Sequence, residues 1–335
     1  MIRLISLILF SAALVQAKPV SIIFDTDMGN DVDDVMALAM IHQLERRGAC
    51  KLLACTSTKD HIKSAPFIDV INTYYGRPDI PVGAVRKGVT PQIGKYIALA
   101  DKKSSTGELV YPRQLDTGLD APDAVDLIRK TLAAQPDGSV KLIQVGFSTN
   151  LAQLLDSKAD THSKLSGPDL VKKKVSQLLV MAGAFTPNGK YKNHREYNVI
   201  MDIPAAQKIA KEWPTEILWS GFEVGAALRY PWKSISEDFT KPTPNLMHES
   251  YIAYVGKPGT ENALWDLTCV LHAAYPDRNY FGLSQKGQVH VTDQGLTHFT
   301  AKSDGRDRYF TMTASQQIRV LETLVQLVST PPPAR

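Results

Sequence analysis

Hydrophobic residues in this chain form short compact runs that alternate with segments of helical periodicity. The compact runs predict strands at residues 20–24, 52–55, 80–83, 141–145, 175–181 and 217–219. Between them, apolar residues recur every three or four positions and predict helices at residues 35–41, 67–75 and 122–132, with another beginning near Asn150. Strands that alternate with helices predict an α/β fold, with a mostly parallel, Rossmann-like open sheet and helices on both faces.

One long segment lacks either pattern. Residues 87–119 are rich in polar, glycine and proline residues, so we predict a long loop that covers part of the protein or acts as a mobile lid. The remaining sequence contains no internal repeat and no low-complexity linker. We therefore predict a single α/β domain over residues 18–335.

The N-terminus is typical of a secretory signal peptide over residues 1–17. Arg3 precedes an apolar run, residues 4–14, and the small residue Ala17 marks the expected cleavage point. The run is too short for a stable membrane anchor, and no later segment is apolar enough to cross a bilayer. We expect a secreted or periplasmic protein; an uncleaved anchor or a buried strand is the alternative.

Composition narrows the possible partners. The 335 residues are 44% hydrophobic and carry a net charge of +4, which excludes a disordered chain or a coiled coil. The densest basic run, residues 172–174, has no interleaved aromatic residues, so we expect no nucleic-acid partner. Three cysteines, Cys50, Cys55 and Cys269, have apolar neighbours and are expected to be buried thiols.

Five aspartates lie within ten residues directly after the first predicted strand: Asp25, Asp27, Asp31, Asp33 and Asp34. Carboxylates this close repel one another unless a cation or a raised pKa compensates. Oxygen ligands without cysteine or histidine favour Ca²⁺ or Mg²⁺.

Three other interpretations of this cluster compete. An EF-hand loop fails, because the twelfth position counted from Asp25 is Met36 rather than glutamate. A haloacid dehalogenase-type phosphatase would use Asp25 as nucleophile and Asp27 as acid and base, but it leaves Asp33 and Asp34 without a role. Helix capping combined with solvated charge is the third interpretation.

The stretch from Asp27 to Asp34 resembles the Asp-x-Asp-x-Gly-x-Asp-Asp signature of the inosine–uridine-preferring nucleoside hydrolase family, with two extra residues. Four later segments resemble motifs of that family in the same order. They are residues 145–152 (VGFSTNLA), 181–184 (MAGA), 196–198 (EYN) and 265–266 (WD). The resemblance covers nearly the whole mature chain.

The resemblance implies a Ca²⁺ site and a ribose site. By resemblance the metal ligands are Asp27, Asp34, Asp266 and the main-chain carbonyl of Val145. The implied ribose ligands are Asp33 and Asn198, with help from Glu196 and contact from Met181. Asn188 or Asn193 is a candidate for a further asparagine contact, Asp25 would support the metal ligands, and Asp31, in the insertion, is expected to cap a helix or act structurally.

Two departures from the family pattern affect the leaving group and the base. Several family members have a histidine where this chain has Trp265, which can stack on a base but cannot deliver a proton. His248, Tyr251 and Tyr254 are candidates to line the base pocket. After the second predicted strand, Asp60 is the tentative match to a family asparagine. Asn150 is interpreted either as part of a family motif or as a helix cap.

Our leading hypothesis is Ca²⁺-dependent hydrolysis of the N-glycosidic bond of ribonucleosides or related N-ribosides, with Asp27 as the base and Trp265 beside the leaving group. The alternatives are a metal-dependent nucleoside or sugar binder without turnover, motivated by Trp265, and the phosphatase described above. The resemblance also implies a small-molecule nucleoside partner, a homo-oligomer and a role in purine or pyrimidine salvage.

Overall fold

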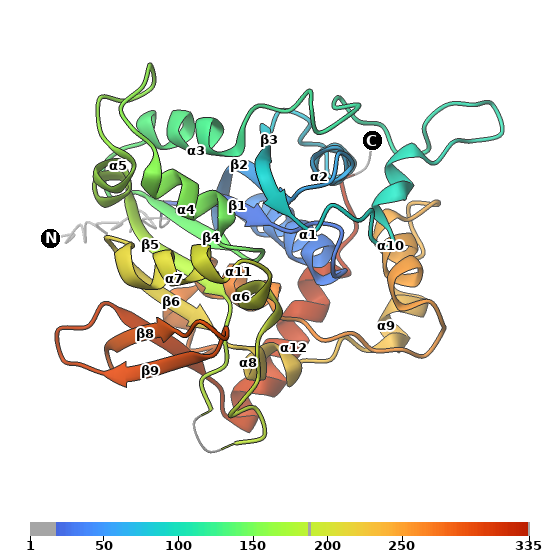
Figure 1. The fold of residues 1–335 in the computed structure, drawn as a ribbon. Coiled ribbons are helices and arrows are strands. Elements are labelled where there is room, and N and C mark those ends of the chain that lie inside the picture. Colours follow the sequence, from blue (N-terminus) through green and yellow to red (C-terminus); the bar gives the residue numbers. More distant parts are fainter. Residues whose placement is uncertain (1–17, 187–188, 334–335) are drawn as a thin grey trace, which may run out of the picture.

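The computed structural model describes residues 18–186 and 189–333, and within them six parallel strands form the centre of the fold (Figure 1). The sheet order is β3-β2-β1-β4-β5-β6, and each neighbouring pair is parallel. The strands are β1 (Val20–Thr26), β2 (Cys50–Lys59), β3 (Val82–Val89), β4 (Val140–Gln144), β5 (Val175–Met181) and β6 (Glu216–Ser220). The predicted α/β fold with a mostly parallel sheet is confirmed.

Four further strands extend the sheet beyond β6. β10 (Asp307–Thr311) runs parallel to β6, whereas β7 (Gly282–Leu283), β8 (Gly287–Val291) and β9 (Thr297–Ala301) are antiparallel additions. The β8–β9 hairpin projects at the lower left of Figure 1. Sequence analysis missed these strands because their exposed positions interrupt any compact apolar run.

Helices cover both faces of the sheet, as predicted (Figure 1). One face carries α1 (Asp33–Arg46), α2 (Ser64–Tyr74), α11 (Asp266–Ala274) and α12 (Ala314–Val328); the other carries α3 (Ala124–Ala133), α4 (Thr149–Asp156), α5 (Gly167–Lys174) and α7 (Ile203–Glu212). The remaining helices are α6 (Tyr197–Met201), α8 (Phe222–Ala226), α9 (Trp232–Glu237), α10 (Leu246–Val255) and the short η1 (Ile97–Asp101) and η2 (Pro276–Arg278). Among the described helices, none is both long and apolar enough to cross a membrane.

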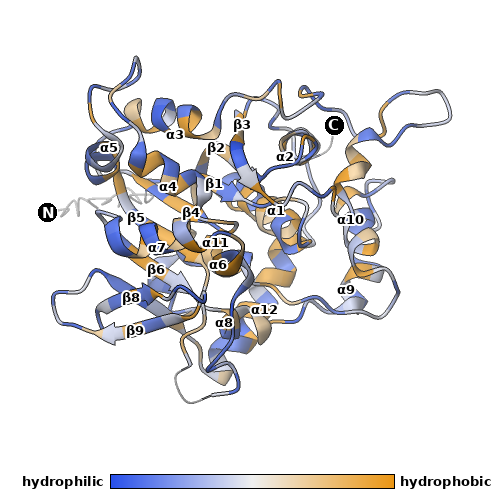
Figure 2. Ribbon diagram, in the orientation of Figure 1, coloured by the Kyte–Doolittle hydropathy of each residue, from blue (hydrophilic) through white to orange (hydrophobic). Residues whose placement is uncertain are grey.

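The core lies in two layers, one on each side of the sheet. Ile22 and Phe24 of β1 pack with the layer that contains α1, whereas Ile23 packs with the layer that contains α4, and all three are fully buried. Successive side chains of a strand point to opposite faces, so a strand between two helical layers must be apolar on both. Figure 2 shows hydrophobic residues on the sides of the helices that meet the sheet.

The segment 87–119 is more ordered than predicted. β3 continues to Val89, and η1 interrupts the irregular stretch. Tyr96 is buried, and its hydroxyl donates to the carbonyl of Asp31 at 2.5 Å and accepts from the N–H of Gly29 at 2.7 Å. The segment therefore covers the acidic loop after β1, and its action as a mobile lid stays a prediction. The three cysteines are buried and free, as expected, and the predicted signal peptide lies outside the described residues.

Candidate active site

The strand order reverses between β1 and β4, which leaves a crevice at the carboxyl ends of these two strands. Val145, directly after β4, donates its N–H to the carbonyl of Asp25 at 2.8 Å. The next residue must be glycine, because a Cβ atom at Gly146 would overlap the backbone nitrogen of Asp27 and the hydroxyl of Thr58. The two strand ends therefore lie in direct contact, and the aspartates after β1 face the crevice.

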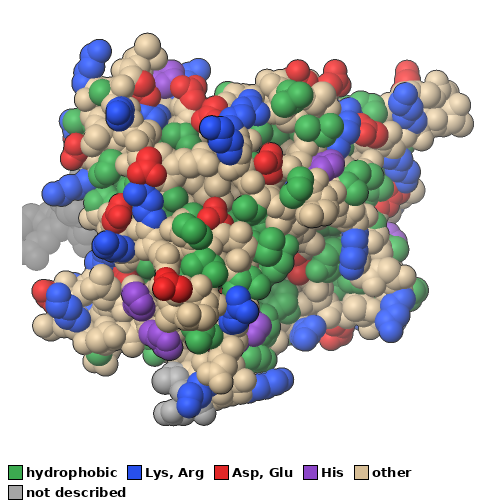
Figure 3. All heavy atoms as spheres, in the orientation of Figure 1, with side chains coloured by type: hydrophobic (Ala, Val, Ile, Leu, Met, Phe, Trp, Pro, Cys, Tyr) green, Lys and Arg blue, Asp and Glu red, His purple; other side chains and the backbone are tan. Residues whose placement is uncertain are grey.

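A cavity of about 460 Å³ opens at this crevice, a size suited to a small organic ligand. Five carboxylates make up its acidic side: Asp27, Asp31, Asp33, Asp34 and Asp266. The lining also includes Val145, Met181, Glu196 and Asn198, and the rings of His194, Tyr197, Phe222, Tyr254 and Trp265. Figure 3 shows a group of hydrophobic side chains near the centre of one face of the molecule, with charged side chains around it.

The acidic side brings together residues that are far apart in the sequence. Asp33, at the start of α1, accepts hydrogen bonds on Oδ2 from the backbone N–H groups of Trp265 (2.9 Å) and Asp266 (3.1 Å), at the start of α11. Carboxylate oxygens of Asp33, Asp34 and Asp266 lie within 4.8 Å of one another. We call these three residues the acidic cluster.

Ionisation of the carboxylates in the acidic cluster is unfavourable in the absence of a cation. Burial, followed by mutual repulsion, raises the pKa of Asp33, Asp34 and Asp266 well above the usual range. Burial also raises the pKa of Asp27 to about 6. A bound cation would reverse this balance, because it favours the ionised carboxylates.

The residues fit a hard divalent cation. Asp266 is buried, yet its carboxylate receives no hydrogen bond from any residue that the structure describes. Its neighbours Asp33 and Asp34 offer oxygen atoms only, and the carbonyl of Val145 lines the same cavity. Several carboxylate oxygens without nitrogen or sulfur donors are typical of Ca²⁺ or Mg²⁺ sites.

Asp25 lies beneath this cavity rather than in it. Its Oδ1 accepts from the hydroxyl of Thr56 (2.6 Å) and the amide of Asn150 (2.8 Å), while Oδ2 has no partner among the described residues. Burial raises the pKa of Asp25 to about 7. The interpretation of Asn150 as a helix cap is wrong, because Ser148 precedes α4 as its cap residue and the Asn150 side chain binds Asp25.

Asp31 has the expected structural role, and its Oδ1 also accepts the N–H groups of Val32 (2.5 Å) and Asp33 (3.4 Å) at the start of α1. The cap residue of α1 is Val32, which makes no side-chain hydrogen bond. Asp31 accepts hydrogen bonds from the amide of Asn262 at 2.7 Å and from the hydroxyl of Tyr254 at 3.0 Å. It therefore joins the acidic loop to α10 and to the segment before α11.

Asn198 and Glu196, which line the cavity, are held in place by hydrogen bonds to the backbone. Asn198 donates its amide to the carbonyls of Val145 (2.8 Å) and Met181 (3.0 Å), which join the ends of β4 and β5. Glu196, the cap residue of α6, accepts from the N–H groups of Gly183, Asn198 and Val199. Burial raises the pKa of Glu196 to about 7 despite these bonds.

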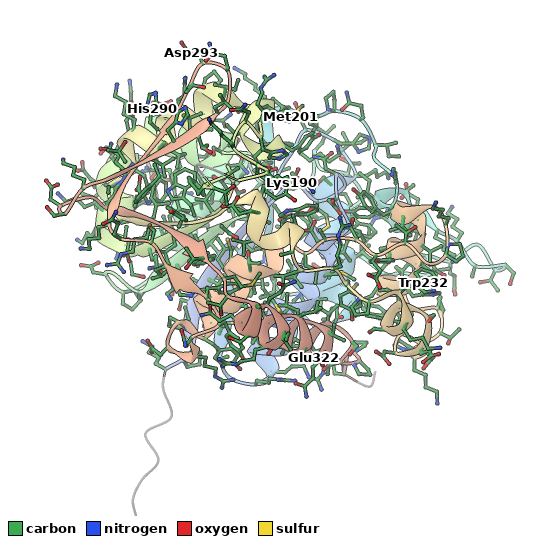
Figure 4. All side chains as sticks on the ribbon, turned by 90° about the horizontal axis from the view of Figure 1, so that it is seen from below. Lys190, Met201, Trp232, His290, Asp293 and Glu322 are labelled. Carbon is green, nitrogen blue, oxygen red and sulfur yellow. The ribbon has the colours of Figure 1, made fainter. Side chains whose placement is uncertain are left out.

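Aromatic rings line the cavity beside the acidic residues, because the backbone N–H of Trp265 donates to Asp33 and the hydroxyl of Tyr254 donates to Asp31. The rings of His194 and Phe222 have centroids 3.8 Å apart, and Trp265 lies 5.4 Å beyond Phe222. Gly225 of α8 makes room for Trp265, because a Cβ atom there would overlap the indole ring. We call His194, Phe222 and Trp265 the ring row. In Figure 4 Lys190, which precedes His194 in the same segment, lies between the hairpin tip at Asp293 and Trp232 of α9.

Residues 22–324 match the sequence family described as inosine-uridine preferring nucleoside hydrolase. The chain belongs to this nucleoside hydrolase family. The match covers β1 from Ile22 onward, the other five central strands and every residue that lines the cavity.

Relatives with known names agree with the nucleoside hydrolase assignment. The pyrimidine-specific ribonucleoside hydrolase RihA of Salmonella paratyphi B is 26% identical over 208 residues, which cover 61% of this chain and 60% of RihA. RihA of Citrobacter koseri is 27% identical over 206 residues, with the same coverage. The chain thus spans about 60% of the length of the curated relatives that it matches.

Solved nucleoside hydrolases share the fold. The plant nucleoside hydrolase PpNRh1 has 21% identity and a TM-score of 0.69, and the match covers 93% of this chain and 100% of that one. An inosine-guanosine nucleoside hydrolase has 17% identity and a TM-score of 0.70, with coverage of 93% and 98%.

The structure brings every predicted site residue of this nucleoside hydrolase family member into the one cavity: Asp27, Asp33, Asp34, Val145, Met181, Glu196, Asn198, Trp265 and Asp266. Of the predicted base-pocket residues, Tyr254 also lines it. Other candidates do not. Asn193 and Asp60 are exposed away from the cavity, Tyr251 is in the core, His248 is half-buried elsewhere, and Asn188 lies outside the described residues.

Sequence analysis missed His194, Arg195 and Phe222 as cavity residues. His194 and Arg195 immediately precede the Glu-Tyr-Asn motif, which was the available signal, whereas nothing in the sequence marks Phe222. It also missed Lys59, next to Asp60. Lys59 is buried, and its ammonium group donates to the side-chain carbonyl of Asn30 (2.6 Å) and to the carbonyl of Thr90 (3.0 Å).

Proposed function

We propose that this protein hydrolyses the N-glycosidic bond of ribonucleosides or related N-ribosides in a Ca²⁺-dependent reaction that releases ribose and the free base. The observation that carries the proposal is the acidic cluster, in which carboxylates from residues 33–34 and 266 approach within 4.8 Å in a cavity that also holds Asn198 and the ring row. A nucleoside joins a polar sugar to a flat base, so its site needs a surface of oxygen ligands next to a surface of aromatic rings.

Asp27, Asp34, Asp266 and the Val145 carbonyl would hold the cation. A divalent cation there would supply Lewis-acid activation of the attacking water and a fixed charge for the ribose hydroxyls. Asp27 accepts the proton of the water as general base. The amide of Asn30 donates to Oδ2 of Asp27 at 2.8 Å, and Lys59 in turn holds Asn30, so the carboxylate has a defined orientation.

The other cavity residues bind and orient the sugar and the base. Asp33, Glu196 and Asn198 bind ribose hydroxyls, and Met181 contacts the ring. Fixed hydrogen bonds of this kind convert binding energy into alignment of the reacting atoms. The carboxylates around the sugar favour the positive charge that develops on it as the glycosidic bond breaks. Trp265 stacks on the base.

The phosphatase alternative is disfavoured by the position of Asp25. That mechanism needs an accessible nucleophile, but Asp25 is fully buried, bonded to Thr56 and Asn150, and absent from the cavity lining. It also gives no reason for Asp34 and Asp266 to meet.

The test is release of free ribose from a panel of purine and pyrimidine nucleosides. The full-length mature protein is dialysed against a chelator and assayed alone, with Ca²⁺ and with Mg²⁺. We expect ribose release that the chelator abolishes and Ca²⁺ restores. Binding without ribose release would select the non-hydrolytic binder, and phosphate release from a phosphomonoester would select the phosphatase.

We also propose that the protein is exported after cleavage behind Ala17, folds as one domain, assembles as a homo-oligomer and serves nucleoside salvage. The signal-like sequence of residues 1–17 supports export. Mass spectrometry of the mature N-terminus tests cleavage, and an intact Met1 would contradict it. Light scattering tests the oligomeric state, and the molar mass of a monomer would contradict the proposed homo-oligomer.

A further inference from the structure

Departure of the base from ribose needs a proton, and the family position for a histidine donor holds Trp265 here. The indole N–H of Trp265 donates to the carbonyl of Phe222 at 2.9 Å, so it is already committed. An indole is also a hydrogen-bond donor that does not release its proton. The proton must come from another group in the cavity.

Most polar groups of the cavity are committed elsewhere. The hydroxyl of Tyr254 donates to Asp31, and both carboxylate oxygens of Glu196 accept backbone N–H bonds. Arginine does not serve as a proton donor in acid catalysis, so Arg195 is not a candidate. Asp27, Asp34 and Asp266 would hold the cation, and Asp33 the ribose. Among the other described residues that line the cavity, two acids remain with free hydrogen-bonding atoms: the imidazole of His194 and the hydroxyl of Tyr197.

His194 is the one of the two that lies where a base would stack. Its ring continues the ring row, with Phe222 between it and Trp265. Trp265 is covalently linked to Asp266 of the acidic cluster, so a base attached to a ribose at that cluster extends along the ring row. Tyr197 packs instead on Phe147, at a centroid distance of 5.9 Å.

We propose that His194 protonates the departing base, an inference that rests on the proposed hydrolase function. The C1′–N bond breaks and its electron pair passes to the base, while a nitrogen of the base takes the proton of the His194 imidazolium. The water oxygen bonds to C1′, and its proton passes to Asp27. Ribose and neutral base leave, after which Asp27 loses a proton to solvent and His194 regains one.

The surroundings of His194 suit this step. Tyr191 of the same segment contacts the His194 ring at a centroid distance of 5.9 Å, and Lys190 lies over Tyr191. Arg195 and Asp266 line the same cavity, and Glu223, next to Phe222 on α8, accepts the N–H of Phe185 at 3.0 Å. Partial burial lowers the pKa of His194, which makes its imidazolium a stronger proton donor.

The experiment compares two substrates with the mature holoprotein in Ca²⁺. Inosine or uridine needs a protonated leaving group, whereas 4-nitrophenyl β-D-ribofuranoside releases an anion that is stable at neutral pH. The variant H194F keeps a ring against Phe222 and removes the proton. We expect kcat for the nucleosides to fall by about 10²-fold to 10⁴-fold, with KM little changed. For the nitrophenyl riboside we expect kcat within about twofold of wild type.

A pH profile and three variants complete the test. Wild-type kcat on nucleosides should fall as the pH rises through the pKa of His194, and this fall should vanish in H194F. H194Q, with no ring and no acidic proton, guards against misfolding of one variant and should repeat the selective loss of kcat. Y197F tests the competing donor and should not reproduce the selective loss on nucleosides. Tyr191 lies outside the cavity lining with its ring 5.9 Å from that of His194, so Y191F is the control and should retain activity on both substrates.

Each contrary outcome has a distinct meaning. Equal losses of kcat on both substrates, or no loss on either, overturn the role of His194 and leave the hydrolase function intact. A selective loss in Y197F with normal H194F assigns the donor to Tyr197 and overturns the inference. Wild-type protein that releases ribose from neither substrate overturns the proposed function itself.

Discussion

The acidic cluster and the ring row lie side by side in one cavity but are held in different ways. The cluster stands at the ends of long, buried elements, β1, α1 and α11, and backbone hydrogen bonds to Asp33 join its parts. The ring row is carried by a loop, the short helix α8 and one helix start, and its members meet through ring contacts and one indole hydrogen bond. In the proposed function, the acidic cluster would meet the ribose, which is common to all ribonucleosides, and the ring row would meet the base, which varies.

The largest expected effect concerns Asp25, which lies beneath the acidic side. Burial raises its pKa from 3.8 to about 7. Asp25 therefore stabilises the folded state fully below pH 3.8, and this stability is lost as the pH rises through 7. Relative to D25N, wild type should lose about 4 kcal/mol of unfolding free energy between pH 4 and pH 8.

Urea unfolding of wild type and D25N in chelator measures this difference. D116N, which removes one exposed carboxylate, controls for the loss of surface charge. If the difference in unfolding free energy between wild type and D25N does not change with pH, Asp25 is not held as a buried protonated acid. The acidic side would then not rest on a buried acid, and it would differ less from the ring row.

The second prediction tests the acidic cluster itself. D266N should weaken Ca²⁺ binding by more than about 100-fold, because removal of a direct ligand exceeds the 10-fold to 100-fold cost of losing an outer partner. Calorimetric titration with Ca²⁺ measures the change. D60N, at the end of β2 and outside the cavity, is the matched control and should bind Ca²⁺ normally. Equal affinities in all three proteins would contradict the metal site.

The third prediction concerns Lys59, the buried cation behind the acidic side. K59M keeps the length of the side chain but leaves Asn30 and the Thr90 carbonyl without their donor, so we expect a loss of about 2 kcal/mol in unfolding free energy. K63M removes a partly exposed ion pair with Asp101 and should cost less than about 1 kcal/mol. Urea unfolding at one pH compares them, and equal costs would refute a special role for Lys59.

The smallest effect is expected on the ring row. W265A should raise KM for nucleosides about 10-fold, because stacking of a base on an aromatic ring contributes about 1–3 kcal/mol. W265F keeps a ring and should lose less. Inhibition by free ribose, which has no base, should be unchanged in both variants. Weaker inhibition by ribose in W265A would show that the two sides are coupled rather than separate.

The same contrast explains what the sequence could predict. The strands of the central sheet are apolar on both faces, so they form compact hydrophobic runs that the sequence shows directly. The five aspartates within ten residues after β1 likewise identify the acidic loop from sequence alone. The antiparallel strands β8 and β9 were missed because exposed residues alternate along them. Phe222 was missed because its position follows from the crossing of α8 and α11, which only the tertiary structure reveals.

The long-range partners of Asp31 and Asn150 could not be predicted, for a related reason. Both residue types are common helix caps, and local sequence favours that interpretation. Their actual partners, Tyr254 and Asn262 for Asp31 and Asp25 for Asn150, lie more than 100 positions away in the chain. Long-range partners of this kind leave no trace in a local pattern.

Trp265 and Asp266 are consecutive residues, yet one belongs to the ring row and the other to the acidic cluster. In the proposed function, a single peptide unit would therefore set the offset between the ring that stacks on the base and the oxygen that binds the ion. A substitution at position 265 would then change base selectivity while the metal ligand at position 266 is kept. An insertion of one residue between them would displace both groups and abolish hydrolysis of any riboside.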